Sequence, residues 1–333
     1  MSINQIINKS RRGFNGFIFG LAALGTFPVM AQQFPTKPIT IIVPYAPGGP
    51  TDTSARGLAE GMSKALGVPI IVNNRPSAGG LVAASFVTKA PKDGYTLLLS
   101  VGTIVSTNPH LYKELPYKVS DLTPISQYAR WPYVISASPM LPANTVAELI
   151  AYAKTKPEGL AFGTVGLGTQ SHIIAAWLAQ RFDIKVELVP YKGVSQAVAD
   201  LSSGRVDLLT DGVSTAVTNH KAGLTKIIAS MGYDRFFMPD GVKTFAESGY
   251  PDLIANSDFG LMAPTGTPEP VIQVLYQAMA KALGSPELQQ QMKQRGENPL
   301  LSASPEAYGT YIQEETVRWG KLIKSLSLQI DPL

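Results

Sequence analysis

Residues 38–66, PITIIVPYAPGGPTDTSARGLAEGMSKAL, contain the most informative local pattern of this chain. Its β-branched and aliphatic run at 39–45 predicts a strand, and the apolar residues of 53–66 recur at helical spacing. Between them lies PGGPTD, residues 47–52, which is a glycine-rich turn. A strand that passes through such a turn into a helix is typical of an α/β sheet with parallel strands.

The same alternation continues along the chain. Further strands are expected at 70–72, 96–100, near 133–138, and at 160–163, 186–190, 206–210, 226–230 and 259–262. Helices are expected at 81–89 and from residues 145, 171, 195 and 267 onward. Thr145 and Glu148 form a capping box, and Thr267 is the expected N-cap before Pro268. The pattern predicts an α/β fold around a mostly parallel sheet.

Length and composition fit a protein of two domains. The 333 residues exceed the usual size of one domain, and a 45% hydrophobic composition supplies a sizeable core. Because the chain has no cysteine, disulfides, thiolate metal sites, cysteine nucleophiles and a lipid-attachment cysteine are excluded. It has three histidines and no HExxH pattern. We therefore expect neither a metal nor a cofactor.

The N-terminus predicts an export signal. Lys9, Arg11 and Arg12 precede an apolar centre at 17–24, and a small-residue cleavage motif ends at Ala31. The alternative, an uncleaved membrane anchor, needs about 20 mostly apolar residues, and here polar residues, glycines and a proline interrupt the run. We expect residues 1–31 to be removed and the mature chain to be periplasmic. The sequence SRRGF resembles a twin-arginine signal, and the general secretory route is the open alternative.

The charge of the mature chain gives no sign of a nucleic-acid partner. Loss of residues 1–31 removes three basic and no acidic residues, so the net charge falls from +4 to +1. Charges of both signs are interspersed along the rest, without the basic stripe or aromatic motifs of nucleic-acid binders. No other segment approaches the length of a membrane span. The sequence predicts a soluble protein that binds no nucleic acid.

Three glycine-rich turns lie where a predicted strand ends and a predicted helix begins. They are PGGPTD at 47–52, SAGG at 77–80 and GTVGLGTQ at 163–170. At the carboxyl ends of parallel strands, glycine lets backbone N–H groups approach an anion, and the helix dipole favours its negative charge. The repetition predicts an anion with two poles. Alternatively, the glycines only supply the positive φ that tight turns need. None of the turns has the order of a nucleotide-binding motif.

The features of an enzyme are weak in this sequence. GVSTA at 212–216 resembles the nucleophile elbow of serine hydrolases but lacks the final glycine, and His220 lies only six residues after Ser214. Ser171 and His172 at a helix start are either ligand contacts or a capping residue beside a partly buried imidazole.

Two aspartates and three arginines have two interpretations each. Asp52 either contacts a ligand or caps the first helix and fixes its glycine turn. Asp211 either accepts hydrogen bonds from a ligand ammonium or hydroxyl group, or ties down a turn with Gly212. The arginines are either partners of a ligand carboxylate or structural charges; they are Arg56, Arg75 and Arg130.

The export signal and a series of motifs together resemble a known family. The matching segments are PITIIVPYAPGGPTD with AR (38–52 and 55–56), NRPSAGG (74–80), DGYTL (93–97), NP (108–109), GTVGLGTQSH (163–172), VPYKG (189–193), SGRVD (203–207), FGL (259–261) and APTGTP (263–268). In combination they are similar to the Bug proteins, the extracytoplasmic solute-binding proteins of tripartite tricarboxylate transporters. The resemblance covers nearly all of the mature chain.

The resemblance implies a two-lobed periplasmic-binding-protein fold of the flytrap type, similar to type II, with the ligand cleft between the lobes. We expect residues 32–130 and 255–333 to form lobe 1 and residues 131–254 to form lobe 2. The family captures a small carboxylate without catalysis and delivers it to two integral-membrane permease subunits. Signalling through a membrane sensor is an alternative role. We expect the chain to act as a monomer.

The resemblance also assigns residues to the cleft. The resemblance implies that the first turn binds one carboxylate of the ligand, largely through backbone groups and ordered water. The residues of this pole are Tyr45, Gly48, Gly49, Thr51 and Asp52. The residues expected to line the rest of the cleft are Ser77, Gly79, Thr103, Gly168, Thr169, Gln170, His172 and Asp211. Two positions depart from the family pattern, because Ser77 stands where glycine is frequent and Leu81 where asparagine is usual. Leu81 makes that side of the cleft more apolar.

The resemblance predicts a carboxylate ligand but leaves several classes of carboxylate open. Family ligands include C4 dicarboxylates, citrate, acidic amino acids, nicotinate-like acids and aromatic dicarboxylates. Glycine-rich and Thr/Ser/His-rich segments in both lobes favour a dicarboxylate, aromatic or C4. The alternatives are an amino acid or a nicotinate-like monocarboxylate, and an enzyme of small carboxylates is the competing class.

Overall fold

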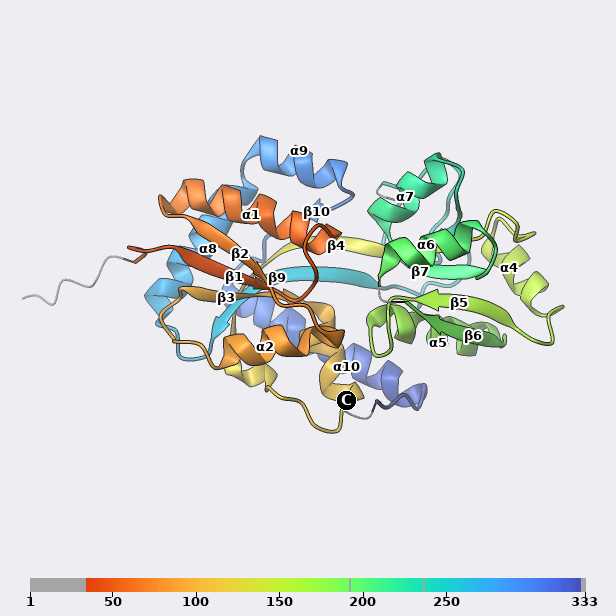
Figure 1. The fold of residues 1–333 in the computed structure, drawn as a ribbon, viewed down its shortest axis with the longest axis horizontal. Coiled ribbons are helices and arrows are strands. Elements are labelled where there is room, and N and C mark those ends of the chain that lie inside the picture. The colour runs from red at the N-terminus through yellow and green to blue at the C-terminus, as the bar shows by residue number, and fades with distance from the viewer. Residues whose placement is uncertain (1–33, 192, 236, 331–333) are drawn as a thin grey trace, which may run out of the picture. The chain divides into compact units, whose positions relative to one another are not determined.

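The first glycine turn joins strand β1 (Ile39–Val43) to helix α1 (Pro50–Leu66), as the sequence predicts (Figure 1). The helix begins three residues earlier than expected because Pro50 lies in its first turn, where a missing N–H is tolerated and φ is already helical. It ends at Gly67, whose φ of 71° forms a left-handed C-cap. A strand, a turn and a helix therefore open the sheet.

The computed structural model describes residues 34–191, 193–235 and 237–330. The predicted signal segment, residues 1–31, lies outside these ranges, so its cleavage and its export route remain predictions. Within them, no helix combines the length and the apolar character that crossing a membrane requires.

Strands and helices alternate over most of the described chain. The remaining strands are β2 (Ile70–Asn74), β3 (Thr96–Val101), β4 (Leu122–Ala137), β5 (Leu160–Thr164), β6 (Val186–Pro190), β7 (Leu208–Gly212), β8 (Lys226–Ser230), β9 (Asn256–Pro264) and β10 (Asn298–Pro299). The remaining helices are α2 (Leu81–Thr88), α3 (Asn108–Leu111), α4 (Val146–Ala153), α5 (Gln170–Phe182), α6 (Val194–Ser202), α7 (Val213–Lys221), α8 (Glu269–Leu283), α9 (Pro286–Gln294) and α10 (Pro305–Ser325). A single π-helical turn, Thr103–Thr107, follows β3 in the described part.

One predicted helix cap is confirmed and one is wrong. The Thr145 side chain accepts the Glu148 N–H at 3.2 Å and caps α4. Thr267 does not cap α8, whose N-cap is Pro268. The Thr267 hydroxyl donates instead to the carbonyl of Pro264 at 2.8 Å, because the chain leaving β9 turns tightly before the helix begins.

The sheet has an antiparallel centre, so the expectation of a mostly parallel sheet is wrong. In the described chain its main order is β2-β1-β3-β9-β4-β7-β5-β6, with β8 and β10 also paired to β4. Parallel pairing holds for β1 with β2 and β3, and for β5 with β6 and β7. β9 and β4 enter between these two sets in the opposite direction to their neighbours. Two parallel sets of strands therefore flank an antiparallel pair.

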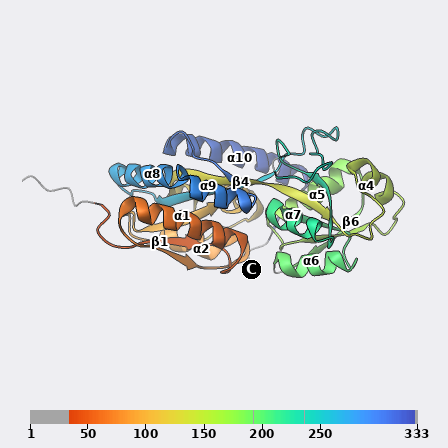
Figure 2. The ribbon, with the colours of Figure 1, turned by 90° about the horizontal axis from the view of Figure 1, so that it is seen from above.

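Strand β4 connects the two parallel sets. Its residues from Leu122 to Pro132 pair with β9, and those from Tyr133 to Ala137 pair with β7 and β8. Figure 2 shows it running from the region of α1, α8 and α9 to the region of α5, α6 and α7. In Figure 1 the arrowheads of β1 and β5 are directed toward each other. The carboxyl ends of the two sets therefore face a common region, whereas the residue bounds of the two lobes remain a prediction.

Helix α10 packs against β4 and the turn at 103–107, and it was not expected from the sequence. Ser304 caps its start by accepting the Ala307 N–H at 3.1 Å. Near this end, the Tyr308 ring lies against Gly260 of β9. Toward its other end, Trp319 is buried in the cluster that also contains residues of α5. The helix thus extends from the central strands to the cluster that contains residues of α5.

Candidate ligand-binding site

The Asp52 carboxylate organises the first glycine turn. It accepts the Gly48 N–H, Arg56 Nε and Asn74 Nδ2, each at 2.9 Å. Asn74 Nδ2 also donates to the Tyr45 carbonyl at 3.0 Å, so the network spans both ends of the turn. Burial by itself raises the pKa of Asp52, but these hydrogen bonds outweigh burial and lower the pKa below its ordinary value. Asp52 therefore fixes the turn, which is one of the two roles considered for it.

The three candidate arginines have structural partners. Arg56 is held by the aspartate of the first turn. Arg130 Nε donates to Asp258 Oδ1 at 2.6 Å. The guanidinium of Arg75 lies 3.7 Å from the centre of the Phe86 ring, a cation–π contact. Each of these cations therefore has a structural role, which was one of the two interpretations considered for it.

The two glycines of the first turn have different backbones. Gly48 has a φ of 81°, which glycine adopts without strain, and an added Cβ would meet no atom within 4 Å. Gly49 has a φ of −77° and a ψ of 170°, and it is the N-cap of α1 without a side-chain cap. The first-turn N–H groups at Thr51 and Asp52 thus receive no side-chain cap, which leaves them to an anion or to water.

Ser77 and Gly79 shape the second turn. The Ser77 hydroxyl accepts the Val82 N–H at 3.0 Å and holds the start of α2. Gly79 has a φ of 60°, and its carbonyl accepts Asn108 Nδ2 at 2.8 Å. A Cβ on Gly79 would lie 3.5 Å from the Tyr112 hydroxyl. The Ser77 hydroxyl is therefore engaged within its own turn.

The third turn is held together by His172 and Thr169. His172 Nδ1 accepts the Gly168 N–H at 3.1 Å, so the proton of the neutral imidazole lies on Nε2. Burial lowers the pKa of His172 and favours that neutral form. Thr169 Oγ1 donates to the Gly166 carbonyl at 2.7 Å, and Thr169 gives α5 no side-chain cap. The start of α5, like that of α1, therefore has no side-chain cap.

Gln170 lies against the end of β3. A Cβ on Gly102 would be only 2.9 Å from Gln170 Nε2, and Gln170 Oε1 accepts the Tyr133 hydroxyl at 3.1 Å. The Tyr45 hydroxyl lies near the side chain of Thr103, the neighbour of Gly102. The structure therefore brings Tyr45, Thr103 and Gln170 together from three distant segments.

Asp211 stands at the carboxyl end of β7 and is only 2% exposed. Its Oδ1 accepts the Gly212 N–H at 2.7 Å. Burial raises the pKa of Asp211 to about 7, and no basic side chain in the described ranges offsets this effect. The turn with Gly212 is thus present, whereas a contact of Asp211 with a ligand remains a prediction.

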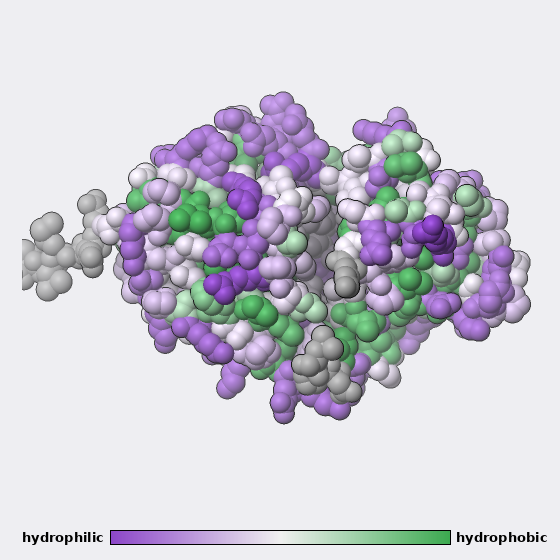
Figure 3. Space-filling model, in the orientation of Figure 1, coloured by the Kyte–Doolittle hydropathy of each residue, from purple (hydrophilic) through white to green (hydrophobic). Residues whose placement is uncertain are grey.

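The second and third turns approach each other around Tyr112. A Cβ on Gly168 would lie 3.4 Å from the Tyr112 hydroxyl and 2.5 Å from Ile330 Cδ1. The Ser77 hydroxyl, in contrast, forms its hydrogen bond within its own turn, and the Asp52 carboxylate binds Gly48, Arg56 and Asn74. Figure 3 shows a hollow between the side that carries α1 and α9 and the side that carries α6 and α7. This hollow is the candidate cleft.

Two residues beside the candidate site were not expected from the sequence. Tyr133 on β4 donates its hydroxyl to Gln170 Oε1, and the Ser257 side chain on β9 lies near Tyr133. Both lie on the strands that connect the two parallel sets, outside every glycine-rich motif. The only available signal was a tyrosine at the start of a strand expected near 133–138.

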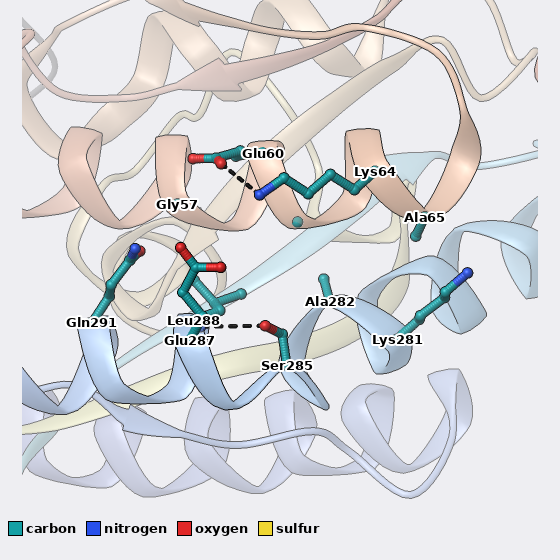
Figure 4. A pocket seen from close by; sticks show the side chains of 11 residues that line it. Gly57, Glu60, Lys64, Ala65, Lys281, Ala282, Ser285, Glu287, Leu288 and Gln291 are labelled. Atoms are coloured by element: carbon teal, nitrogen blue, oxygen red, sulfur yellow. Dashed lines mark hydrogen bonds and ion pairs between the residues drawn. The ribbon is translucent and has the colours of Figure 1, made fainter.

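A separate groove of about 210 Å³ lies between α1 and the helices α8 and α9 (Figure 4). Glu60 and Lys64 at its edge pair with each other at 2.8 Å, and both side chains are largely exposed. Its floor is narrow because Gly61 approaches the Ala282 side chain. None of the candidate ligand residues lines it. Among the residues that the structure describes, no cluster of His, Asp and Glu side chains could hold a metal ion.

Comparisons with known proteins agree with this architecture. The family model described as "Tripartite tricarboxylate transporter family receptor" matches residues 54–328. Protein BugT of Bordetella pertussis is 33% identical over 320 residues, which cover 93% of this chain and 98% of BugT.

Solved structures are similar over the same extent. The Rhodopseudomonas palustris protein Rpa4515, solved with adipate, is 32% identical with a TM-score of 0.82, over 89% of this chain and 100% of that one. MatC of Rhodopseudomonas palustris, with bound malate, is 29% identical with a TM-score of 0.78, over 87% of this chain and 100% of MatC. The fold is thus the two-lobed α/β fold of periplasmic binding proteins. The chain belongs to the tripartite tricarboxylate transporter receptor family, the TctC or Bug family, whose members are periplasmic solute-binding proteins and not enzymes.

Proposed function

We propose that this protein captures a small dicarboxylate in the periplasm and delivers it to the membrane subunits of a tripartite tricarboxylate transporter. The observation that carries the proposal is the pair of helices α1 and α5, whose N-termini lack side-chain caps. Each follows a glycine-rich turn at the carboxyl end of a parallel strand, where N–H groups and the helix dipole attract an anion. One carboxylate of the ligand binds at each helix.

Backbone groups supply the attraction at the first pole. Arg56 is held by Asp52, so its charge is already balanced within the turn. The Gly48 N–H is likewise engaged, which leaves the first-turn N–H groups of α1 as the donors. Tyr45 and Thr103 lie beside this pole and Gln170 beside the second. Thr169 and His172 hold the third turn in the shape that the second pole requires.

Closure of the two lobes brings the poles together. The proposed bounds are residues 32–130 with 255–333 for lobe 1 and residues 131–254 for lobe 2. In support of these bounds, β4 changes its pairing partner between Pro132 and Tyr133. β9 runs beside it, so a bend at this level moves one parallel set relative to the other.

The ligand is proposed to be a dicarboxylate because solved relatives contain adipate and malate. Both are dicarboxylates, and they differ in chain length and in the hydroxyl group of malate. Leu81, at the start of α2 beside the second turn, offers apolar surface to a longer or aromatic ligand. We therefore expect the ligand to be an aromatic or a C4 dicarboxylate.

Asp211 favours a second candidate ligand, an amino acid. A buried carboxyl group without a basic side-chain partner is stabilised when a ligand ammonium or hydroxyl donates to it. An amino acid with an acidic side chain would satisfy Asp211 and both helix N-termini. The role of Asp211 thus separates the two ligand classes.

The proposed partners are the two permease subunits of the transporter, with the chain acting as a monomer. The alternative partner is a membrane sensor. Deletion of the permease genes abolishes ligand-dependent growth if the chain serves transport, whereas loss of a transcriptional response with uptake intact identifies a sensor. Mass spectrometry of the exported protein tests cleavage after Ala31.

A thermal-shift screen followed by calorimetry tests the ligand. The exported protein is screened against adipate, malate, phthalate, aspartate and nicotinate. A ligand at about 100 times its dissociation constant stabilises the folded protein by about 2.7 kcal/mol, which is readily seen in a melt. Recovery of the intact ligand from denatured complex distinguishes binding from turnover. The proposal is wrong if no dicarboxylate shifts the melt.

A further inference from the structure

We propose that a C-terminal strap, residues 326–330, holds the third glycine turn in its ligand-binding shape, and that Ile330 is the positioning residue through which the strap acts. The inference rests on the proposed function, in which the third turn carries the second pole. The strap lies outside every glycine-rich motif of the chain. It would act on the ligand only through the turn that it covers.

The strap leaves α10 through a turn and presents apolar side chains at every second position. Helix α10 ends at Ser325, and Ser327 adopts a left-handed φ of 52°, which ends the helical path. Leu326, Leu328 and Ile330 pack against the hydrophobic cluster that contains residues of α5. The residues between them are exposed. The alternation therefore directs one side of the strap toward the core.

Backbone hydrogen bonds tie the strap down at both ends. Where it leaves α10, Gln180 Nε2 of α5 donates to the Ser325 carbonyl at 3.1 Å. At its other end, the Ile330 N–H donates to the carbonyl of Leu111, a buried residue, at 2.9 Å. Ile330 also pairs with Tyr112 as a parallel bridge. The strap therefore connects α5 to the segment that follows α3.

The Ile330 side chain covers Gly168 in the third turn. A Cβ on Gly168 would lie 2.5 Å from Ile330 Cδ1 but 3.9 Å from Ile330 Cγ1, so one methyl group makes the close approach. The Gly168 N–H donates to His172 Nδ1 at 3.1 Å. Gly168 is thus held from two sides, by the imidazole at its N–H and by the strap at its Cα.

Tyr112 extends this contact to the second turn. Its hydroxyl lies 3.4 Å from the Cβ position of Gly168 and 3.5 Å from that of Gly79. Because the strap pairs with the backbone of Tyr112, a single segment fixes the place where these two turns meet. Displacement of the strap would let the third turn move relative to the second.

A glycine-rich turn gains most from such a support. Gly166 and Gly168 both have positive φ, and glycine populates many other conformations when nothing restrains it. A turn that is ordered before the ligand arrives saves the entropy that ordering would cost on binding. Ile330→Val removes only the Cδ1 methyl group that touches the turn, and we expect it to weaken dicarboxylate binding about threefold.

A double-mutant cycle between the strap and the turn tests the inference by calorimetry with adipate and with malate. Gly168→Ala is expected to weaken binding roughly tenfold, because its Cβ meets Ile330 Cδ1 and a φ of 76° is strained for alanine. Adding Ile330→Val removes the methyl group that collides, so the double variant is expected to bind about threefold more tightly than Gly168→Ala. The same substitution thus acts in opposite directions in the two proteins, which a general loss of stability does not produce.

Leu328→Ala is the matched control. Leu328 lies on the strap and packs against the same cluster, but it is not one of the residues nearest to Gly168. It is expected to lower the melting temperature and to leave the affinity for both probes unchanged. Thermal melts without ligand establish that each variant is folded. If Gly168→Ala does not fold, Ile330→Val and Leu328→Ala decide alone, and equal losses of affinity overturn the inference.

The outcomes separate this inference from the proposed function. If Ile330→Val weakens binding by the same factor in the parent and in Gly168→Ala, the strap does not control the turn, and the inference is overturned while dicarboxylate binding stands. If Ile330→Val leaves affinity unchanged in both, the inference is overturned in the same way. If Gly168→Ala binds like the parent, the third turn lies outside the site, and both the inference and the assignment of the second pole are wrong.

Discussion

The Arg56 guanidinium donates to both carboxylate oxygens of Asp52, through Nε at 2.9 Å and Nη2 at 3.0 Å. The two residues lie one helical turn apart on α1, and Asp52 reaches back from there to the Gly48 N–H. A buried carboxylate, rather than a cation exposed to the ligand, therefore controls the first turn. If the proposed ligand binds at this turn, its affinity is expected to depend on the shape of the turn.

Replacing Gly48 with alanine is expected to weaken dicarboxylate binding by roughly tenfold. Gly48 has a φ of 81°, and an L-residue in that region costs about 1–2 kcal/mol even though an added Cβ meets no atom. The strain moves the N–H groups that follow in the turn. Gly67→Ala is the matched control, because Gly67 at the other end of α1 has a φ of 71° and equally open surroundings. Calorimetry in which both variants bind alike contradicts the prediction.

Arg56→Gln is expected to lower the melting temperature at pH 7 and to reduce affinity only a few-fold. The arginine side chain is 53% exposed, so its pairing with Asp52 contributes about 1 kcal/mol at most. Asp52 has a lowered pKa, so its stabilisation is complete above the ordinary pKa and is lost as pH falls through the folded-state pKa. The difference in melting temperature between the parent and Arg56→Gln is therefore expected to become smaller as the pH falls. Abolished binding with an unchanged melt would show that Arg56 holds the ligand directly.

Local patterns explain which parts of the fold could be predicted. The strand at 39–45 and the helix that follows it are each specified by residues within one short window, and both are present. β4 begins at Leu122, far earlier than the strand expected near 133–138. The first part of the strand could not be predicted, because it contains Pro124 and Pro132, and proline is unfavourable within a strand. It accommodates Pro124 beside a register shift. The antiparallel centre depends on β9 joining from a distant segment, which no local window reveals.

The candidate site also contains some residues that could be predicted from local sequence and others that could not. Gly48, Gly79 and Gly168 could be identified because a turn with positive φ requires glycine at that position in the chain. Tyr133 could not be identified, because its hydroxyl contacts Gln170, which is distant in sequence. Turns are encoded locally, whereas contacts between distant segments appear only in the fold.

His172→Asn is expected to reduce the loss of stability between pH 7.5 and pH 5.5. The pKa of His172 is lowered by burial, so the folded state keeps the imidazole neutral while the unfolded chain binds a proton below about pH 6.5. Stability is therefore full above that pH and falls as the solution is acidified. Asparagine retains an acceptor for the Gly168 N–H but does not titrate. Parallel melts with the same pH slope for both proteins would rule out this role for His172.

Asp211→Asn is expected to stabilise the ligand-free protein at alkaline pH. The pKa of Asp211 is raised from 3.8 to about 7, so the folded state binds a proton that the unfolded state has already released. Stability falls as pH rises between these two values, and the full penalty, about 4 kcal/mol, applies above pH 7. Asparagine avoids this penalty and keeps an acceptor for Gly212. The stability difference between variant and parent should be about 2–3 kcal/mol larger at pH 8.5 than at pH 5.

Calorimetry on the same pair of proteins decides what Asp211 does with a ligand. If its carboxyl group accepts a ligand ammonium, Asp211→Asn loses aspartate binding and retains adipate binding, because adipate carries no donor for it. If Asp211 only ties down the turn through Gly212, the variant binds every ligand of the parent with similar affinity, since its side-chain oxygen still accepts that N–H. A variant that is more stable at pH 8.5 but binds neither ligand would contradict both roles. It would mean that the ionised carboxyl group shapes the whole cleft.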